Sequence, residues 1–328
     1  MNVIDFHNHF YPPEYLSEIQ TGPSNVKITF DSDNNPLLHY PGDYNIVVKG
    51  HRDIVFREQV LDQNRIEKQV LTFTSPGVQI ESPKRAVVLA RIVNDVFAKI
   101  VDERGDYFTA LATLPLNDPS TSVMELERAV SELGFKGVML FSNVNGKALS
   151  NEDYWPLYEK AEELNVVFYI HPIHPVGVEA MREHWLMPLV GFTFDTTLAA
   201  SKLVFSGVVE KFPRIKWVLA HLGGAIPYIV ERLDRGYYAF KECRKNISKP
   251  PSEYLKEFYY DSVNFDLSAL QLAIDFAGAD HILAGSDYPH QIGSLKKMVE
   301  SIKQLNVSEE DKAKISRKNV IKLLNLKK

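Results

Sequence analysis

Short apolar runs alternate with helical patterns along almost the whole of this 328-residue chain. The runs are continuously apolar, as strands buried on both faces of a parallel sheet must be. Eight units of strand followed by helix predict an α/β fold of the (β/α)8 or TIM-barrel type. The expected strands cover residues 3–9, 69–73, 108–114, 137–141, 166–171, 216–221, 258–262 and 282–286.

A doubly wound open sheet is the alternative architecture. No Gly-x-Gly-x-x-Gly sequence follows any expected strand, which disfavours the dinucleotide-binding form of that fold. Helices are expected between the strands and after the last one, and Ser120 is the expected N-cap of the third. They cover residues 54–64, 83–104, 120–133, 152–164, 194–211, 225–240, 268–276, 294–304 and 308–325.

Residues 10–53 interrupt this pattern directly after the first strand. The segment is dense in the turn formers Pro, Gly, Asn and Asp. Three runs within it are expected to be short strands: residues 26–30, 37–40 and 44–48. We interpret the segment as a small inserted domain that caps a barrel of residues 1–9 and 54–328. A structureless surface loop is the alternative, although long loops of that kind are uncommon in compact domains.

Polar residues mark the carboxyl ends of several expected strands, where barrels of this kind carry their chemistry. His7 and His9 end the first strand one pleat apart, so both point to the same face. His171 and His221 end the fifth and sixth strands, and Asp287 ends the eighth. Imidazoles with a carboxylate suit Zn²⁺ or a similar divalent ion with an open position. For the first pair alone, two structural histidines bonded to backbone are the alternative.

Not all five of these side chains need to bind the metal. A site for one ion would use His7, His9, His171 and Asp287. His221 would then lie nearby as a general acid or base, since its ordinary pKa suits proton transfer near neutral pH. The fourth strand ends without a lysine or carboxylate that could bridge a second ion, which favours a single metal.

The remaining histidines carry weaker expectations. His39 and His51 lie in the inserted segment and are expected at the surface or on a lid. His174 and His290 follow strand ends and are candidates to line a substrate pocket, with exposed loop positions as the alternative. His281 precedes the eighth strand, at the end of the barrel away from the chemistry.

Composition excludes several classes of protein. The net charge of −5 gives no basic surface of the kind that binds nucleic acid. No apolar run approaches the roughly 18 residues needed to cross a bilayer, and the first residues enter a strand without a signal segment. Cys243 is the only cysteine, so neither an internal disulfide nor a cysteine metal cluster can form. We therefore expect a cytoplasmic protein without nucleic-acid or membrane partners.

The motifs at the strand ends also resemble a known family, the amidohydrolase superfamily, and within it the aminocarboxymuconate-semialdehyde decarboxylase branch. The matching motifs are Asp5-Phe6-His7-Asn8-His9, His171-Pro172, Ala220-His221-Leu222-Gly223-Gly224 and Gly285-Ser286-Asp287-Tyr288-Pro289, with further similarity over residues 132–138 and 185–213. The resemblance implies a barrel with an inserted small domain and one zinc ion on the four ligands named above, with His221 beside them. It also implies non-oxidative decarboxylation without an organic cofactor.

The resemblance is weaker where the substrate is held. The arginine with which the namesake enzyme grips a substrate carboxylate falls near Asn45. Its pocket tryptophan falls near Pro188, with Trp185 close by, and the phenylalanine after its Asp-Tyr-Pro motif is His290 here. Arg232 matches an arginine that the family contributes from a neighbouring subunit, which implies a homodimer. The candidate substrate-binding residues are therefore Asn45, Trp185, Arg232 and His290.

The leading hypothesis is a metal-dependent carboxy-lyase that removes CO2 from a small unsaturated or aromatic carboxylic acid. His221 and Asp287 would manage the protons. The alternative is a metal-dependent hydrolase of the same superfamily, a lactonase or amidohydrolase, in which Asp287 takes a proton from the attacking water. The same ligands serve both reactions, so the strand ends do not separate them. A non-catalytic binding protein is a third possibility, which the complete ligand set disfavours.

Overall fold

All eight expected strands are present in the computed structural model, which describes residues 2–41 and 43–327. They are β1 (Ile4–His9), β5 (Lys68–Thr72), β6 (Phe108–Ala110), β7 (Gly137–Phe141), β10 (Val167–His171), β11 (Lys216–Leu219), β12 (Tyr259–Asp261) and β13 (Ile282–Leu283). They form two parallel sheets, in the orders β1-β5-β6 and β13-β12-β11-β10-β7. The α/β class with parallel strands is therefore confirmed.

Backbone hydrogen bonds also link the outer strands of one sheet with those of the other. The amide of Ala112, just after β6, donates to Gly137 of β7 at 3.0 Å. At the opposite edges, the amide of Phe6 in β1 donates to Ala284, directly after β13, at 2.7 Å. Each of the eight parallel strands therefore lies beside the strands that come before and after it in the order given above.

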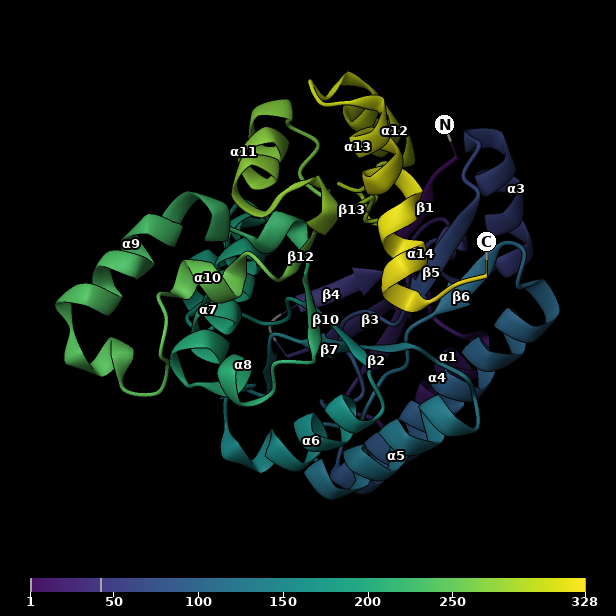
Figure 1. Ribbon diagram of the computed structural model, residues 1–328. Coiled ribbons are helices and arrows are strands. Elements are labelled where there is room, and N and C mark those ends of the chain that lie inside the picture. Colours follow the sequence, from purple (N-terminus) through teal and green to yellow (C-terminus); the bar gives the residue numbers. More distant parts are fainter. Residues whose placement is uncertain (1, 42, 328) are drawn as a thin grey trace.

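Figure 1 shows the strands in the centre of the molecule and the helices around them. These helices are α3 (Ile54–Asn64), α4 (Pro83–Arg104), α5 (Pro119–Ser131), α6 (Trp155–Glu163), α7 (Phe192–Phe205), α8 (Val208–Lys211), α9 (Ile226–Ala239), α10 (Pro251–Leu255), α11 (Leu267–Ala277), α12 (Leu295–Gln304), α13 (Glu309–Ala313) and α14 (Asn319–Leu324). Within the described part of the chain, none of the helices is both long and apolar enough to span a bilayer.

Three expectations about these helices are wrong in detail. The helix expected over residues 194–211 is divided, because Gly207 adopts a left-handed φ of 85° between α7 and α8. The last expected helix consists of α13, a π-helical turn over Lys314–Lys318, and α14. Asp118 rather than Ser120 caps α5, accepting from the amide of Thr121 at 3.1 Å, since proline takes the first helical position.

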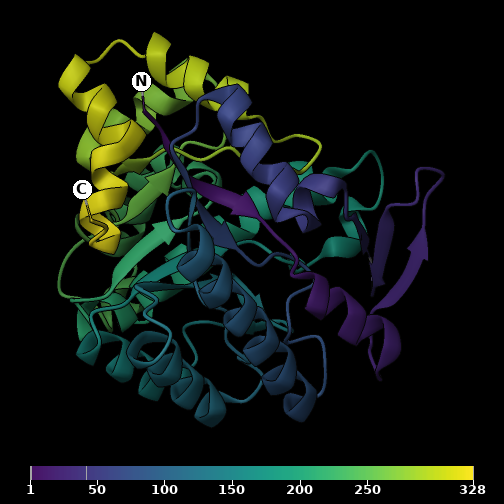
Figure 2. The same ribbon diagram turned by 90° about the vertical axis from the view of Figure 1, so that its right-hand side faces the viewer.

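The segment over residues 10–53 contains the three expected strands, together with two helices that the sequence analysis did not predict. β2 (Lys27–Phe30), β3 (Pro36–Tyr40) and β4 (Asp43–Ile46) pair as an antiparallel sheet. The additional helices are α1 (Pro13–Thr21) and α2 (Lys49–Arg52). Proline begins α1, and Tyr15 and Ile19, four residues apart, bury the same face of it. Figure 2 shows the small sheet at one side of the molecule, next to α1.

Alternate side chains of the parallel strands enter two separate apolar clusters. Phe168 and Ile170 of β10 belong to the larger cluster, which the helices cover, whereas Val167 and Tyr169 belong to a smaller cluster made mostly by strands. Side chains of a strand alternate with period two, so His171 continues the series of Val167 and Tyr169. The end of that inner series is where the functional residues lie.

Candidate metal centre and the pocket beside it

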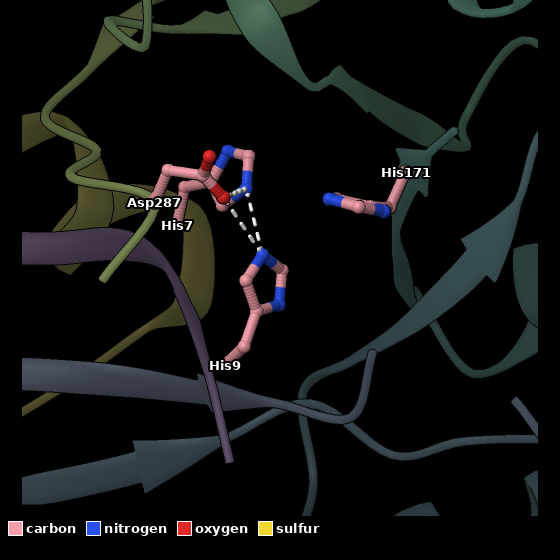
Figure 3. Close-up of side chains that lie close together, drawn as sticks. All are labelled: His7, His9, His171 and Asp287. Carbon is pink, nitrogen blue, oxygen red and sulfur yellow. Dashed lines mark hydrogen bonds and ion pairs between the residues drawn. The ribbon is translucent and has the colours of Figure 1, made fainter. Parts of the chain in front are cut away.

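Four side chains from three strand ends converge at one point (Figure 3). His7 and His9 lie on β1, His171 ends β10, and Asp287 follows β13. One potential ligand atom from each residue lies within 4.8 Å of the others, and all four residues are buried. His7 Nε2, His9 Nε2 and Asp287 Oδ1 form a triangle with sides of 3.1 Å. The structure thus brings together the four ligands expected from the sequence.

The two histidines of β1 owe their direction to an irregularity in that strand. The pairing of β1 with β5 shifts register between Asp5 and Asn8. In a regular strand Phe6 and His7 would face opposite sides of the sheet. Both instead contact the ring of Tyr169, at centroid separations of 5.1 and 5.6 Å. Bulges re-aim side chains in this way and are common beside functional sites.

Each of the three histidines of the centre, His7, His9 and His171, has a polar atom beside its Nδ1. This is the ring nitrogen that faces away from the centre. The pairs are His7 Nδ1 with Asp261 Oδ2 at 2.6 Å, His171 Nδ1 with the Pro172 carbonyl at 2.8 Å, and His9 Nδ1 with Thr72 Oγ1 at 3.2 Å. A ring that donates from Nδ1 keeps its lone pair on Nε2, the nitrogen that points to the centre. Such partners fix the tautomer and the orientation of metal-binding histidines.

This donor set fits a divalent cation. Nε2 of His171 is buried and has no hydrogen-bond partner among the described residues. The 3.1 Å separations are close to the separation of about 3.3 Å between ligands at tetrahedral corners with bonds of roughly 2.0–2.1 Å. Burial alone would lower the pKa of His7, but Asp261 and Asp287 raise it to about 10, so the carboxylates favour positive charge here. A divalent cation would satisfy both these carboxylates and the lone pair of His171.

Asp261, at the end of β12, is a site residue that the sequence analysis did not identify. Its Oδ2 faces His7 and also accepts from the hydroxyl of Tyr169 at 3.0 Å. Its Oδ1 accepts from the amide of Leu222 at 3.3 Å. One buried carboxylate therefore holds a candidate metal ligand, His7, and also the turn that carries His221.

His221 lies beside the four ligands, as expected, in that turn after β11. Its ring centroid is 5.0 Å from that of His7 and 5.4 Å from that of His171. Its φ of 53° and that of Leu222, 56°, are left-handed. Nδ1 of His221 is buried without a partner among the described residues. Burial and the nearby His7 lower the pKa of His221 to about 4, so that the ring is neutral near pH 7.

A cavity of about 330 Å³ opens beside this centre. We call the four expected ligand residues together with His221 the floor, of which His171, His221 and Asp287 line the cavity, and we call the other lining residues the wall. The wall is mostly apolar, with Ile46, Val48, Trp185, Pro188, Leu189, Phe192, Pro289 and Ile292. Its polar members include Asn45, Ser75, His51 and His290, and no lysine or arginine is among its described residues.

Three of the four candidate substrate residues lie in the wall. The amide nitrogen of Asn45 is already used, because it donates to the Tyr11 hydroxyl at 3.0 Å and to the Ser75 carbonyl at 2.8 Å. Trp185 is 54% exposed. His290 lies with its ring centroid 4.7 Å from that of His9. The fourth candidate, Arg232, is exposed on α9 and is absent from the described lining of its own subunit's cavity.

Three other histidines have the following positions. Of the two positions expected for His51, at the surface or on a lid, the surface alternative is wrong, because this residue of the inserted segment is only 1% exposed and lies in the wall. His174 borders a second cavity, away from the floor. His39 lies outside both cavities and contacts Thr29 through Nε2 at 2.7 Å.

Comparison with known proteins adds the family. The sequence model described as amidohydrolase matches residues 4–326. The chain belongs to the amidohydrolase family. Within this family, the chain is 34% identical over 275 residues to the 2-amino-3-carboxymuconate-6-semialdehyde decarboxylase of Dictyostelium discoideum, which covers 82% of this chain and 76% of the relative. It is likewise 34% identical over 284 residues to the gamma-resorcylate decarboxylase of a Polaromonas species, with 82% and 86% covered.

Solved structures of the family agree with this assignment. The dihydroxybenzoic acid decarboxylase of a Polaromonas species, with bound manganese and the inhibitor 2-nitroresorcinol, superposes with a TM-score of 0.84 at 29% identity. The match covers 99% of this chain and 98% of that one. The predicted resemblance to the decarboxylase branch of the amidohydrolase superfamily is therefore confirmed.

Proposed function

We propose that this protein is a metal-dependent, non-oxidative decarboxylase of a small aromatic or unsaturated carboxylic acid. The observation that carries the proposal is the buried centre of three histidines and one aspartate beneath a mostly apolar wall. The floor suits a carboxylate, and the wall suits a flat apolar ring. The two curated relatives described above are named as decarboxylases, which supports this reaction over hydrolysis.

The residues of the floor have two roles in the reaction, metal binding and proton transfer. A divalent ion held by His7, His9, His171 and Asp287 supplies Lewis-acid polarisation of substrate oxygen atoms. Loss of CO2 breaks the bond between the carboxylate carbon and its neighbour, which keeps the electron pair and takes a proton. His221 and Asp287 are titratable groups that belong to the floor and line the cavity. Because the His221 ring is neutral near pH 7, we assign to the two groups the relay of that proton, which they take from solvent or from a substrate hydroxyl and pass to the carbon.

Product analysis tests the reaction class. The metal-loaded protein is incubated separately with gamma-resorcylate, with aminocarboxymuconate semialdehyde and with a panel of lactones and amides. Release of CO2 from a carboxylate that depends on His221 supports the proposal. Hydrolysis of a lactone or amide without release of CO2 from any carboxylate would favour the hydrolase alternative.

Zinc is the metal we propose. Three imidazole nitrogens with one carboxylate oxygen form a common donor set for zinc. Manganese, which the Polaromonas relative binds, is the competing candidate. Elemental analysis of protein purified without added metal, followed by reloading of the stripped protein with either ion, distinguishes them.

We also infer that the eight strands close into a (β/α)8 barrel, with residues 10–53 as an inserted cap. The hydrogen bonds that join the outer strands of the two sheets support closure. The cap is supported by the contribution of its residues Tyr44, Asn45 and His51 to the wall. Deletion of the three cap strands should then leave the metal centre intact while weakening substrate binding.

The proposed oligomer is a homodimer in which Arg232 reaches the pocket of the other subunit. Tyr228, one turn earlier on the same face of α9, is 82% exposed, and Phe194 on α7 is 58% exposed. The two helices adjoin, because the amide of Ala225 donates to Thr197 of α7 at 2.8 Å. Large exposed apolar side chains on two adjoining helices suit a subunit contact. The planar guanidinium suits a substrate carboxylate.

Mixing two inactive variants tests the shared site. His221→Asn and Arg232→Ala proteins are combined under conditions where subunits exchange. In a two-fold dimer about a quarter of the wild-type activity should return, since half of the dimers are mixed and each mixed dimer holds one complete site. Arg235→Ala, on the same helix, is the control and should stay active. Full activity of a protein that sediments as a monomer would contradict the proposal.

A further inference from the structure

His51 is a polar group of the wall that neither the metal centre nor the proposed proton transfer uses. It lies in α2, a single turn of the inserted segment, and its side chain is 1% exposed. Both ring nitrogens are buried and have no hydrogen-bond partner among the described residues. Buried polar groups are rarely left unpaired unless a ligand or an ordered water serves as their partner.

The backbone around His51 fixes where this ring lies. The His51 carbonyl accepts from the amide of Tyr11 at 2.7 Å. The preceding residue, Gly50, packs so closely that a Cβ there would clash with the Tyr288 hydroxyl and lie 2.9 Å from Cζ of Tyr288 and 3.1 Å from Cβ of Pro289. Its carbonyl accepts from Nε of the buried Arg57 at 3.1 Å. The chain therefore anchors α2 from two sides while it leaves the imidazole of His51 unpaired.

The ring of His51 lies beyond His290 as seen from the metal centre. Its centroid is 5.0 Å from that of His290, which in turn is 4.7 Å from that of His9. Burial, followed by the nearby His290 and Arg57, holds the pKa of His51 well below its usual range. A neutral imidazole presents one N–H donor and one acceptor nitrogen. Whichever of these two nitrogens faces the cavity, an uncharged hydroxyl can pair with it, because a hydroxyl both donates and accepts.

We propose that His51 is a specificity-determining residue that hydrogen-bonds a hydroxyl substituent of the substrate ring, away from the carboxylate at the metal centre. The assignment rests on the proposed function, because it places the substrate carboxylate at the floor. Asn45, the other polar side chain that the cap offers nearby, is less free for this role, since its amide nitrogen serves Tyr11 and Ser75. A site built to bond a hydroxyl discriminates against analogues without it.

Equilibrium binding tests the proposal with benzoate and 2-, 3- and 4-hydroxybenzoate as probes, measured by calorimetry on the metal-loaded protein. At least one hydroxybenzoate should bind about 10-fold more tightly than benzoate, the value of one good hydrogen bond. In His51→Leu and in the ring-shaped His51→Phe, that preference should fall to near unity while benzoate affinity and metal content are unchanged. His51→Gln should keep part of the preference.

His174→Leu is the matched control, because His174 also has an unpaired buried nitrogen but borders the second cavity. It should keep the full preference for the hydroxyl. A preference that survives in whichever of His51→Leu and His51→Phe folds would overturn the role of His51 alone. If none of the four probes binds, both the proposed role of His51 and the proposed substrate class are overturned. If the preference for a hydroxybenzoate disappears in the His51 variants but the wild-type protein releases no CO2, the binding role of His51 is supported. Only the proposed decarboxylation is then contradicted.

Discussion

The imidazoles of the floor and those of the wall are held in different ways. In the floor, each ligand histidine has a protein oxygen beside Nδ1, as His7 has Asp261 at 2.6 Å. In the wall, His51 is held by its backbone and by ring packing, and neither of its ring nitrogens has a hydrogen-bond partner among the described residues. The floor stands at the ends of parallel strands, whereas the wall is formed largely by the inserted segment and by loops.

This difference between floor and wall shows which side chains must be positioned most accurately. A metal site requires its ligands within fractions of an ångström, which strand ends and supporting hydrogen bonds provide. Recognition of a substrate ring needs groups whose hydrogen-bonding capacity is unused until the ligand arrives. Loops on a rigid scaffold supply such groups and can change without disturbing the chemistry beneath them. Four substitutions test this separation between the floor and the wall.

Removal of a metal ligand should have the largest effect. His7→Ala deletes one corner of the donor triangle and leaves Asp261 without its partner. Since loss of a supporting partner alone costs about 10–100-fold in metal affinity, loss of a ligand should cost more than about 100-fold and abolish turnover. Elemental analysis and activity of the variant measure this. His39→Ala, outside the cavity, should leave both unchanged, and full metal occupancy of His7→Ala would contradict the assignment.

Removal of the proton-transfer group should spare the metal. His221→Asn keeps a polar side chain in the turn but cannot act as a base near neutral pH. Turnover should fall by roughly 10²–10⁴, the usual contribution of a general acid or base, with metal content unchanged. Parallel measurement of kcat and bound metal separates the roles, because concurrent loss of metal would make His221 a ligand instead.

Weakening the support of a ligand should give an intermediate loss. Asp261→Asn keeps the shape of the side chain but removes the charge that faces His7 and orients its ring. Metal affinity should fall by about 10–100-fold, as determined by competition with a chelator. Asp275→Asn, on the exposed side of α11, serves as the control. An unchanged affinity in Asp261→Asn would mean that strand geometry alone positions His7.

A change in the wall should leave the floor intact. In Gly50→Ala the new methyl group would crowd Tyr288 and Pro289, so the free energy of unfolding should fall by about 1–3 kcal/mol. Because α2 must shift to relieve the contact, KM should rise while metal affinity is retained. Gly236→Ala, whose Cβ would meet nothing closer than 3.9 Å, is the control and should not destabilise the protein. Loss of metal in Gly50→Ala would show that the two regions are coupled.

The floor could be predicted from the sequence because its residues stand at positions that a regular pattern identifies. His171 and Asp287 follow short apolar runs, and parallel strands bring the ends of such runs together. The same argument applies to Asp261, which ends β12. Its role was missed because no histidine marks that strand end, and a single aspartate after an apolar run is also a common start of a loop.

The wall could not be predicted to the same depth. His51 stands among Lys49, Gly50 and Arg52, a polar context that indicates the surface. Its burial involves segments distant in the chain, because its ring centroid lies 5.0 Å from that of His290 and the preceding Gly50 packs against Tyr288, and no local pattern records these contacts. The bulge in β1 is equally hidden, since it depends on the pairing with β5 rather than on the sequence of β1 alone.

The separation of His9 and Asp287 by 278 residues has a consequence for how the protein comes into being. On the ribosome the histidine pair emerges long before the carboxylate that completes the triangle, because 278 residues separate His9 from Asp287. A nascent chain therefore carries a histidine pair without the remaining donors, and β1 waits for β13 before its second edge is paired. Contacts between such distant segments form slowly, because a long loop must close first. Binding of the metal by all of these donors therefore requires that the chain from His7 to Asp287 has been made and has folded.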